Sequence, residues 1–213
     1  MAREARSRGM PGPGDRVLWH ATPVVGLSSF RPLSHFGSRR AALERIQNVI
    51  RRRGWQYRPD LWDTPGMDVF PFQLHPVTLD VTCPLEVPDM VGARHSSLEL
   101  VDHLHYRRRP VISQEGRDRV LAAWGRCQAT EMTGDQLLEA QGRQDRALAG
   151  IVRELGHDGM AYLNTHEDRG NPCWITLDPC QVHPAGPVED MTLDLALEEL
   201  EGGLATALGM GGP

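Results

Sequence analysis

The sequence predicts an α+β domain in which the first and last strands meet in one sheet and helices lie between them. Short apolar or alternating runs, which are typical of strands, occupy residues 16–20, 70–81, 160–163 and 174–182. Between residues 97 and 155 the apolar residues recur at helical spacing instead. Strand runs near both ends of a chain, with a helical block between them, favour this fold class.

The first half of the chain contains one clear helix. Residues 16–20 form the first expected strand, and Ser38 is placed to cap a helix over residues 39–53. Ala42, Leu43 and Ile46 give that helix an apolar face, so we expect its arginines to lie on a solvated face. Residues 70–81 alternate as strands do, with Pro76 either interrupting them or marking an edge.

The second half begins with three expected helices. Residues 97–108 form the first, which Pro110 ends. Ser113 caps the second, which runs to about residue 127, and Thr133 opens the third, which Gly156 ends. A break follows at residues 184–187, and residues 191–208 are an amphipathic helix or a loose tail.

Composition and charge narrow the class of protein. The 213 residues are 40% hydrophobic and 24% charged, which suits one folded domain with a sizeable core. No apolar run is long enough to cross a bilayer and no secretory signal begins the chain, so we expect a cytoplasmic protein, in its own cell or delivered into a target cell, without membrane contact. The four cysteines lack zinc spacing, so we expect a reducing compartment and no metal.

The charges are unevenly placed along the chain, whose net charge is −5. The first quarter is rich in arginine, whereas every charged residue after position 185 is acidic. We expect residues 1–15 to be a flexible arm, residues 16–184 the folded domain, and residues 185–213 an acidic tail or helix. That tail either binds a partner or shields the basic part of the chain.

A polar loop between two apolar strands is the most informative local feature. Residues 156–163 read as a tight turn and a buried strand, and a second apolar strand begins at Trp174. The loop between them holds Glu167 and Asp168. Such a loop can fix a reactive carboxylate, but it is also compatible with an ordinary hairpin.

Three segments, in order, resemble motifs of the ADP-ribosyltransferase superfamily, in its diphtheria-toxin-like and poly(ADP-ribose)-polymerase-like branch. Residues 18–22 (LWHAT) resemble a strand that ends in His-Gly-Ser or His-Gly-Thr. Residues 35–38 (HFGS) resemble the aromatic residue and small-residue turn that lead into a helix. Residues 156–182 resemble the last motif of phage and mobile-element transferases. The stretch from residue 55 to residue 153 has no such match.

The resemblance implies a split antiparallel β-sheet fold, with helices inserted between the first and last strands and NAD bound as a substrate. It implies a mono-ADP-ribosyltransferase, an enzyme of the glycosyltransferase class, acting on an unidentified protein or nucleic acid as a toxin, an effector or a phage host-modifier. The alternatives are an NAD glycohydrolase and a catalytically inactive NAD-binding protein of the same fold.

The resemblance also implies roles for individual residues. Glu167 and His20 are the implied catalytic residues, with His20 and Thr22 on a ribose and His35 or Phe36 packed on the nicotinamide ring. The residues implied to contact the cofactor are His20, Ala21, Thr22, His35, Phe36, Gly37, Ser38, Tyr162 and Asn164.

Elementary chemistry suits these residue types. Breaking the nicotinamide–ribose bond builds an oxocarbenium-like centre, which a nearby carboxylate stabilises. A neutral imidazole can donate and accept at once, as a ribose diol requires.

The chain departs from the family pattern at three places. Ala21 replaces a glycine, and His35 stands where many relatives have tyrosine. Cys173 occupies the position, directly before the aromatic Trp174, at which the polymerase-like branch has its catalytic glutamate. Asp168 and Asp178 therefore remain alternatives to Glu167.

Overall fold

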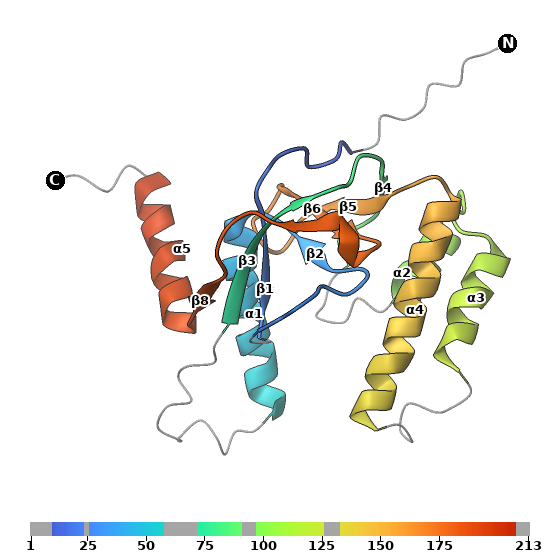
Figure 1. Cartoon of the computed structure of the whole chain (residues 1–213), viewed down its shortest axis with the longest axis horizontal. Helices are drawn as coiled ribbons and strands as arrows, with labels where there is room; N and C mark the ends of the chain where they lie inside the picture. Colours follow the sequence, from blue (N-terminus) through green and yellow to red (C-terminus); the bar gives the residue numbers. More distant parts are fainter. Residues whose placement is uncertain (1–9, 24–25, 58–71, 91–96, 126–132, 208–213) are drawn as a thin grey trace, which may run out of the picture.

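Two four-stranded sheets form the centre of the molecule, with helices on both sides of them (Figure 1). The computed structural model describes residues 10–23, 26–57, 72–90, 97–125 and 133–207. In the first sheet β3 (Phe72–Leu79) pairs with β1 (Leu18–Thr22) on one side and with β7 (Val182–Pro184) and β8 (Glu189–Met191) on the other. The second sheet has the order β2 (His35–Phe36), β6 (Pro172–Thr176), β5 (Gly159–Leu163) and β4 (Pro84–Glu86). All pairs are antiparallel except β4 with β5, so the fold is α+β as predicted.

The sheets are joined where β1 passes the end of β2. Trp19 N donates to Gly37 O at 2.8 Å, and Gly37 N donates to Trp19 O at 3.2 Å. A Cβ on Gly37 would lie 2.7 Å from Cys173 Sγ, so only glycine fits at this joint. The prediction that the first and last strands share a sheet is therefore wrong for the strands it named, because β5 and β6 lie in the second sheet, where β6 pairs with β2. The late strands in the sheet of β1 are β7 and β8, which the sequence does not predict apart from Val182.

Five helices in the described ranges cover the sheets, and their caps are largely those that the sequence predicts. The helices are α1 (Arg39–Tyr57), α2 (Ser97–His105), α3 (Gln114–Trp124), α4 (Gly134–Glu154) and α5 (Leu193–Ala207). Ser38 Oγ accepts from Ala41 N at 3.0 Å at the start of α1. Ser113 caps α3, and Thr133 forms a capping box with Gln136 at α4. Figure 1 shows α2, α3 and α4 on one side of the sheets and α1 and α5 on the other.

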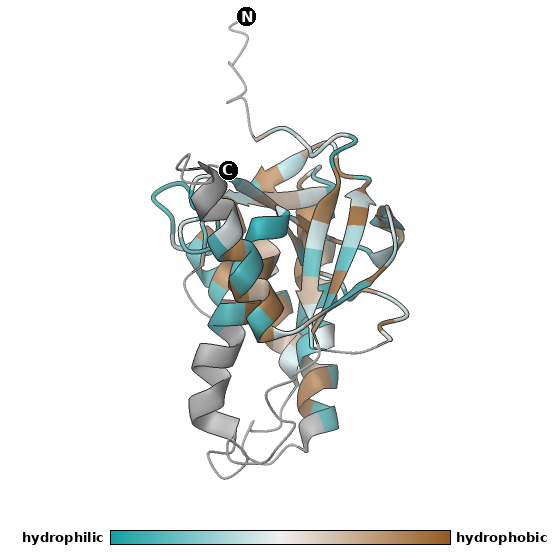
Figure 2. Ribbon diagram, turned by 90° about the vertical axis from the view of Figure 1, so that its left-hand side faces the viewer, coloured by the Kyte–Doolittle hydropathy of each residue, from teal (hydrophilic) through white to brown (hydrophobic). Residues whose placement is uncertain are grey.

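Alternating side chains divide the core into three layers. Met160, Tyr162, Cys173 and Ile175 face α2–α4, whereas Ala161 and Trp174 face the first sheet. On the far side of the first sheet, Phe72 and Leu74 pack on α1 and α5. Because β5 and β6 are buried on both faces, their sequences are almost entirely apolar. The bands of hydrophobic and hydrophilic residues along the sheets and helices can be followed in Figure 2.

Pro76 neither interrupts the strand nor marks a sheet edge, contrary to both predictions made for it, because β3 is continuous and has partners on both sides. It lies within β3, opposite Trp19, and its carbonyl accepts from Ala185 N at 2.9 Å. The N–H and C=O of one residue point to the same side of a strand, so the N–H that Pro76 lacks would also point toward the β7 and β8 side. At Pro76 that side lies between the end of β7 and the start of β8, where no strand residue needs the donor. The central strand tolerates proline because that place needs no donor.

Both ends of the described chain pack on the domain. Residues 1–9 of the expected arm lie outside the described residues, but Pro11 O accepts from Trp174 Nε1 at 3.2 Å and Pro13 is buried. At the other end, Arg39 of α1 pairs with Glu189 at 2.7 Å and Glu199 at 2.6 Å and stacks on Trp19. The described part of the acidic segment is thus β8 and α5, and it covers basic charge on α1.

Candidate functional site

His20 is held at the joint between the two sheets. Its Nδ1 lies 2.8 Å from His35 O, so Nδ1 carries the proton and Nε2 is the acceptor of the neutral ring. The rings of Phe30 and Phe36 lie 5.3 Å and 5.4 Å away. Burial lowers the pKa of His20, and the charges of His75 and Arg45 lower it further, although the hydrogen bond to His35 opposes this. His20 is therefore a neutral imidazole at pH 7.

Two neighbours of His20 were not found from the sequence. His75 lies directly opposite His20 on β3, and the Phe30 ring stands edge-on to both imidazoles. His75 Nε2 is buried without a hydrogen-bond partner among the described residues. No local pattern marks either residue, because the contact depends on the β1–β3 register and on the path of the loop before β2.

His35 and Tyr162 meet on the helix-facing side of the second sheet. His35 Nδ1 lies 3.1 Å from the Tyr162 hydroxyl, although the two strands are separated by β6. Cys173 of β6 is the cross-strand partner of Tyr162. Burial raises the pKa of Cys173 to about 11, so it is an uncharged thiol at pH 7. The position that holds glutamate in the polymerase-like branch therefore carries no negative charge here.

Asn164 organises the loop between β5 and β6. Its side chain is buried, and its Oδ1 accepts from His166 N at 3.1 Å and from Glu167 N at 2.9 Å. Its Nδ2 donates to Cys173 Sγ at 3.4 Å. The Asn164 amide group therefore holds the backbone that carries Glu167.

The loop is also fastened to α1 through Asp168. The Asp168 carboxylate accepts from Ser38 Oγ, and Asp168 N donates to Glu44 Oε2 at 2.6 Å. Asp168 has a φ of 44°, a conformation that aspartate tolerates better than most residues. Its carboxylate is engaged at the helix start, which makes it a poorer candidate than Glu167 for a reactive group.

Glu167 lies beside two residues of α1. Asn48 Nδ2 donates to Glu167 Oε1 at 3.2 Å, and Arg45 Nη1 lies 3.6 Å from the same oxygen. The Arg45 charge also contributes to lowering the pKa of His20, after burial and the charge of His75. Arg45 and Asn48 thus tie the loop that carries Glu167 to α1.

The remaining implied cofactor residues differ in accessibility. Phe36 is 1% exposed and packs in the layer between the sheets, so only His35 of that pair is placed to touch a ligand. Ala21 packs toward α1, on the opposite face of β1 from His20, so its methyl group does not crowd the imidazole. Thr22 is buried at the end of β1. Gly37 and Ser38 form the joint and the start of α1.

A cavity of about 90 Å³ opens beside His35 and Tyr162, between the second sheet and helices α2 and α4. Its polar groups are His35, Tyr162, Ser97 and Asp145, and Ser97 Oγ donates to Asp145 Oδ1. The rest of the lining is apolar: Leu33, Val87, Pro88, Met90, Leu100, Met160 and Ile175. An engineered cavity of about 150 Å³ holds benzene, so this space suits part of a ligand and not a whole dinucleotide.

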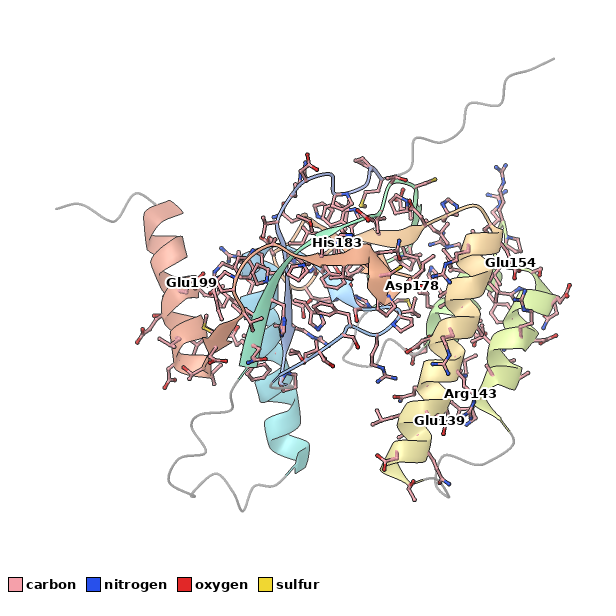
Figure 3. All side chains as sticks on the ribbon, viewed as in Figure 1. Glu139, Arg143, Glu154, Asp178, His183 and Glu199 are labelled. Atoms are coloured by element: carbon pink, nitrogen blue, oxygen red, sulfur yellow. The ribbon has the colours of Figure 1, made fainter. Side chains whose placement is uncertain are left out.

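Asp178, the other alternative acid, lies away from this cluster. It caps a 3-10 turn (Pro179–Gln181) and pairs with Arg153 of α4 at 3.1 Å. Figure 3 shows Asp178 next to α4. Gln181 bonds the backbone of residues 80, 158, 177 and 178, which is a structural role.

The described residues offer neither a metal site nor a membrane-spanning helix. No three His, Cys, Asp or Glu side chains are grouped so as to hold a metal ion. No helix in those ranges has the length and apolar character needed to span a bilayer.

Comparison with known proteins gives little. No protein-family model matches the chain, and no curated protein matches it. Among solved structures, the chain is similar to one in the crystal structure of the M. tuberculosis MbcT–MbcA toxin–antitoxin complex. The match has 12% identity and a TM-score of 0.40, and it covers 86% of this chain and 87% of that chain. A likeness this loose carries no argument about activity, so the function has to be argued from the residues of this chain.

Proposed function

We propose that the chain is an NAD-dependent mono-ADP-ribosyltransferase that modifies a macromolecule. The proposal is supported by the held carboxylate of Glu167, whose Oε1 accepts from Asn48 Nδ2 at 3.2 Å and lies 3.6 Å from Arg45 Nη1, and by the buried, neutral imidazole of His20. Two separate sheets, bridged by backbone hydrogen bonds at Trp19 and Gly37, also suit the split-sheet fold implied by the sequence motifs.

In the proposed site, His20 binds a ribose of NAD. Its neutral ring presents Nε2 as an acceptor for a ribose hydroxyl. His35 packs on the nicotinamide ring, for which the cavity beside Tyr162 offers apolar walls and a carboxyl group at Asp145. Burial raises the pKa of Asp145, and its carboxyl oxygens can accept from the N–H groups of a carboxamide.

Glu167 is the proposed catalytic carboxylate. The bond between nicotinamide and the ribose C1′ breaks, and nicotinamide leaves with the bonding electrons. The Glu167 charge stabilises the positive C1′ centre. An acceptor hydroxyl or amine then bonds to C1′ and gives its proton to Glu167. The uncharged Cys173 thiol cannot supply that charge, which favours Glu167 over the position before Trp174.

The test is incubation of the purified protein with labelled NAD and cell lysate. Glu167→Gln is the test variant, and Glu86→Gln, at an exposed position on β4, is its matched control. The proposal predicts label on protein or nucleic acid for wild type and Glu86→Gln, and at least a hundredfold loss for Glu167→Gln. Release of nicotinamide without labelled polymer identifies the glycohydrolase alternative. Binding of NAD without turnover identifies the inactive binder, and no binding at all refutes an NAD site.

A further inference from the structure

α1 carries a row of side chains that faces the loop between β5 and β6. Positions 38, 41, 45 and 48 follow one another at helical spacing and therefore lie on one face. Ser38 bonds Asp168, whereas Arg45 and Asn48 approach Glu167. The apolar residues Leu43 and Ile46 occupy the opposite face and pack in the layer beneath the first sheet. The helix thus divides into a core face and a face that receives the loop.

We propose that Arg45 and Asn48 are positioning residues for Glu167, and that they hold one carboxylate oxygen so that the other is presented to substrate. This inference rests on the proposed function. Both side chains converge on Oε1, at 3.6 Å and 3.2 Å. Within the described residues, Oε2 has no hydrogen-bond partner and is not one of the buried polar atoms. The side chain of Glu167 retains 16% of its exposure, so solvent or substrate can reach it.

The backbone is fixed separately from the carboxylate. Glu167 N donates to Asn164 Oδ1, and the next residue is tied to Ser38 and Glu44. Without Arg45 and Asn48, the glutamate side chain would still start from the same place but would be free to rotate. Orientation of a reacting group, and not its presence, is then what these two residues supply.

The charge of Arg45 has a second effect, on His20. It opposes protonation of that imidazole, after burial and the charge of His75. The other groups that face His20 are His75 on β3 and the His35 carbonyl on β2. Those that face Glu167 from the second sheet are Tyr162 and Cys173, and the Glu167 charge helps to raise the pKa of both, after burial.

The test compares Arg45→Gln, Arg45→Lys and Asn48→Ala with Arg119→Gln. Arg119 pairs with Glu154 on the far side of the helical block and serves as the matched control. Steady-state nicotinamide release is measured against NAD concentration. We expect kcat to fall at least tenfold in Arg45→Gln and Asn48→Ala with KM within threefold of wild type. We expect Arg45→Lys to recover part of kcat, and Arg119→Gln to match wild type. Unchanged kcat in both test variants overturns the inference.

A second readout does not depend on turnover. The pKa of His20 is followed through its Cε1–H NMR signal in wild type, Arg45→Gln and Arg119→Gln. Loss of the Arg45 charge should raise the pKa of His20, whereas Arg119→Gln should leave it unchanged. If wild type releases no nicotinamide, the proposed function fails, while the His20 signal still decides whether the Arg45 charge acts on His20. An unchanged His20 pKa in Arg45→Gln contradicts that effect.

Discussion

Gly37→Ala tests the joint on which the whole site depends. Gly37 bonds Trp19 of β1, and a Cβ at this position would lie 2.7 Å from Cys173 Sγ and 3.2 Å from Ala41 Cβ. The φ of Gly37 is not positive, so space is the only obstacle. Overpacking of this kind costs about 1–3 kcal/mol. One kcal/mol shifts the Tm of a domain of this size by about 2–4 °C, so a loss of about 2–12 °C is expected.

A double-mutant cycle makes this prediction specific. Cys173→Ala removes the sulfur that Gly37→Ala would meet, so the double variant should be more stable than the sum of the single effects by about 1 kcal/mol or more. Gly150→Ala on α4 is the matched control, because a Cβ there has no heavy atom within 4 Å. It should be neutral or stabilising by up to about 1 kcal/mol. Urea unfolding measures all four variants. Additive effects of Gly37→Ala and Cys173→Ala, or a neutral Gly37→Ala, would refute the packing described at the joint.

Three further predictions concern charge and burial. Burial is the main cause of the lowered pKa values of His20 and His75, so the unfolded chain binds more protons than the folded one just below pH 6.5. The urea midpoint should therefore fall as the pH drops from 7 to 5, and a rise would contradict this prediction. Cys173 should resist iodoacetamide in the native state while the exposed Cys83 and Cys180 react, as peptide mass spectrometry would show; rapid labelling of Cys173 would mean that it is not buried. Arg39→Ala should cost about 0.2–1 kcal/mol for each of its two half-exposed ion pairs, less in 1 M salt; a loss that salt does not reduce would point to its stacking on Trp19 instead.

The sequence predicted local features better than pairings. Ser38, Ser113 and Thr133 were identified as helix caps because capping depends only on residues within one turn. Gly156, with a φ of 87°, was identified as a helix end for the same reason. By contrast, β7 (VHP) and β8 (EDM) are short and polar, and neither carries an apolar signal. They are strands because β3 offers them partners.

The candidate site shows the same division. His20, His35, Tyr162 and Glu167 stand in motifs that can be read along the chain; the structure joins His35 to both His20 and Tyr162, and places Glu167 against α1. Arg45 was expected on a solvated helix face, but it faces Glu167 because the loop after β5 folds back on α1. Phe30 contacts His20 because of the path of the loop before β2, and His75 lies opposite His20 because of the β1–β3 register. Neither contact can be read from the sequence near these residues.

NMR mapping of NAD on the backbone amides most directly tests whether the two ends of the chain form one binding site. NAD is titrated into the isotope-labelled protein, and shift changes are followed at His20, His35, Tyr162 and Glu167, with α3 as an internal reference. We predict that these four residues shift together along one binding isotherm while α3 is unaffected. Shifts confined to one motif, or no shifts at millimolar NAD, would contradict the proposed site.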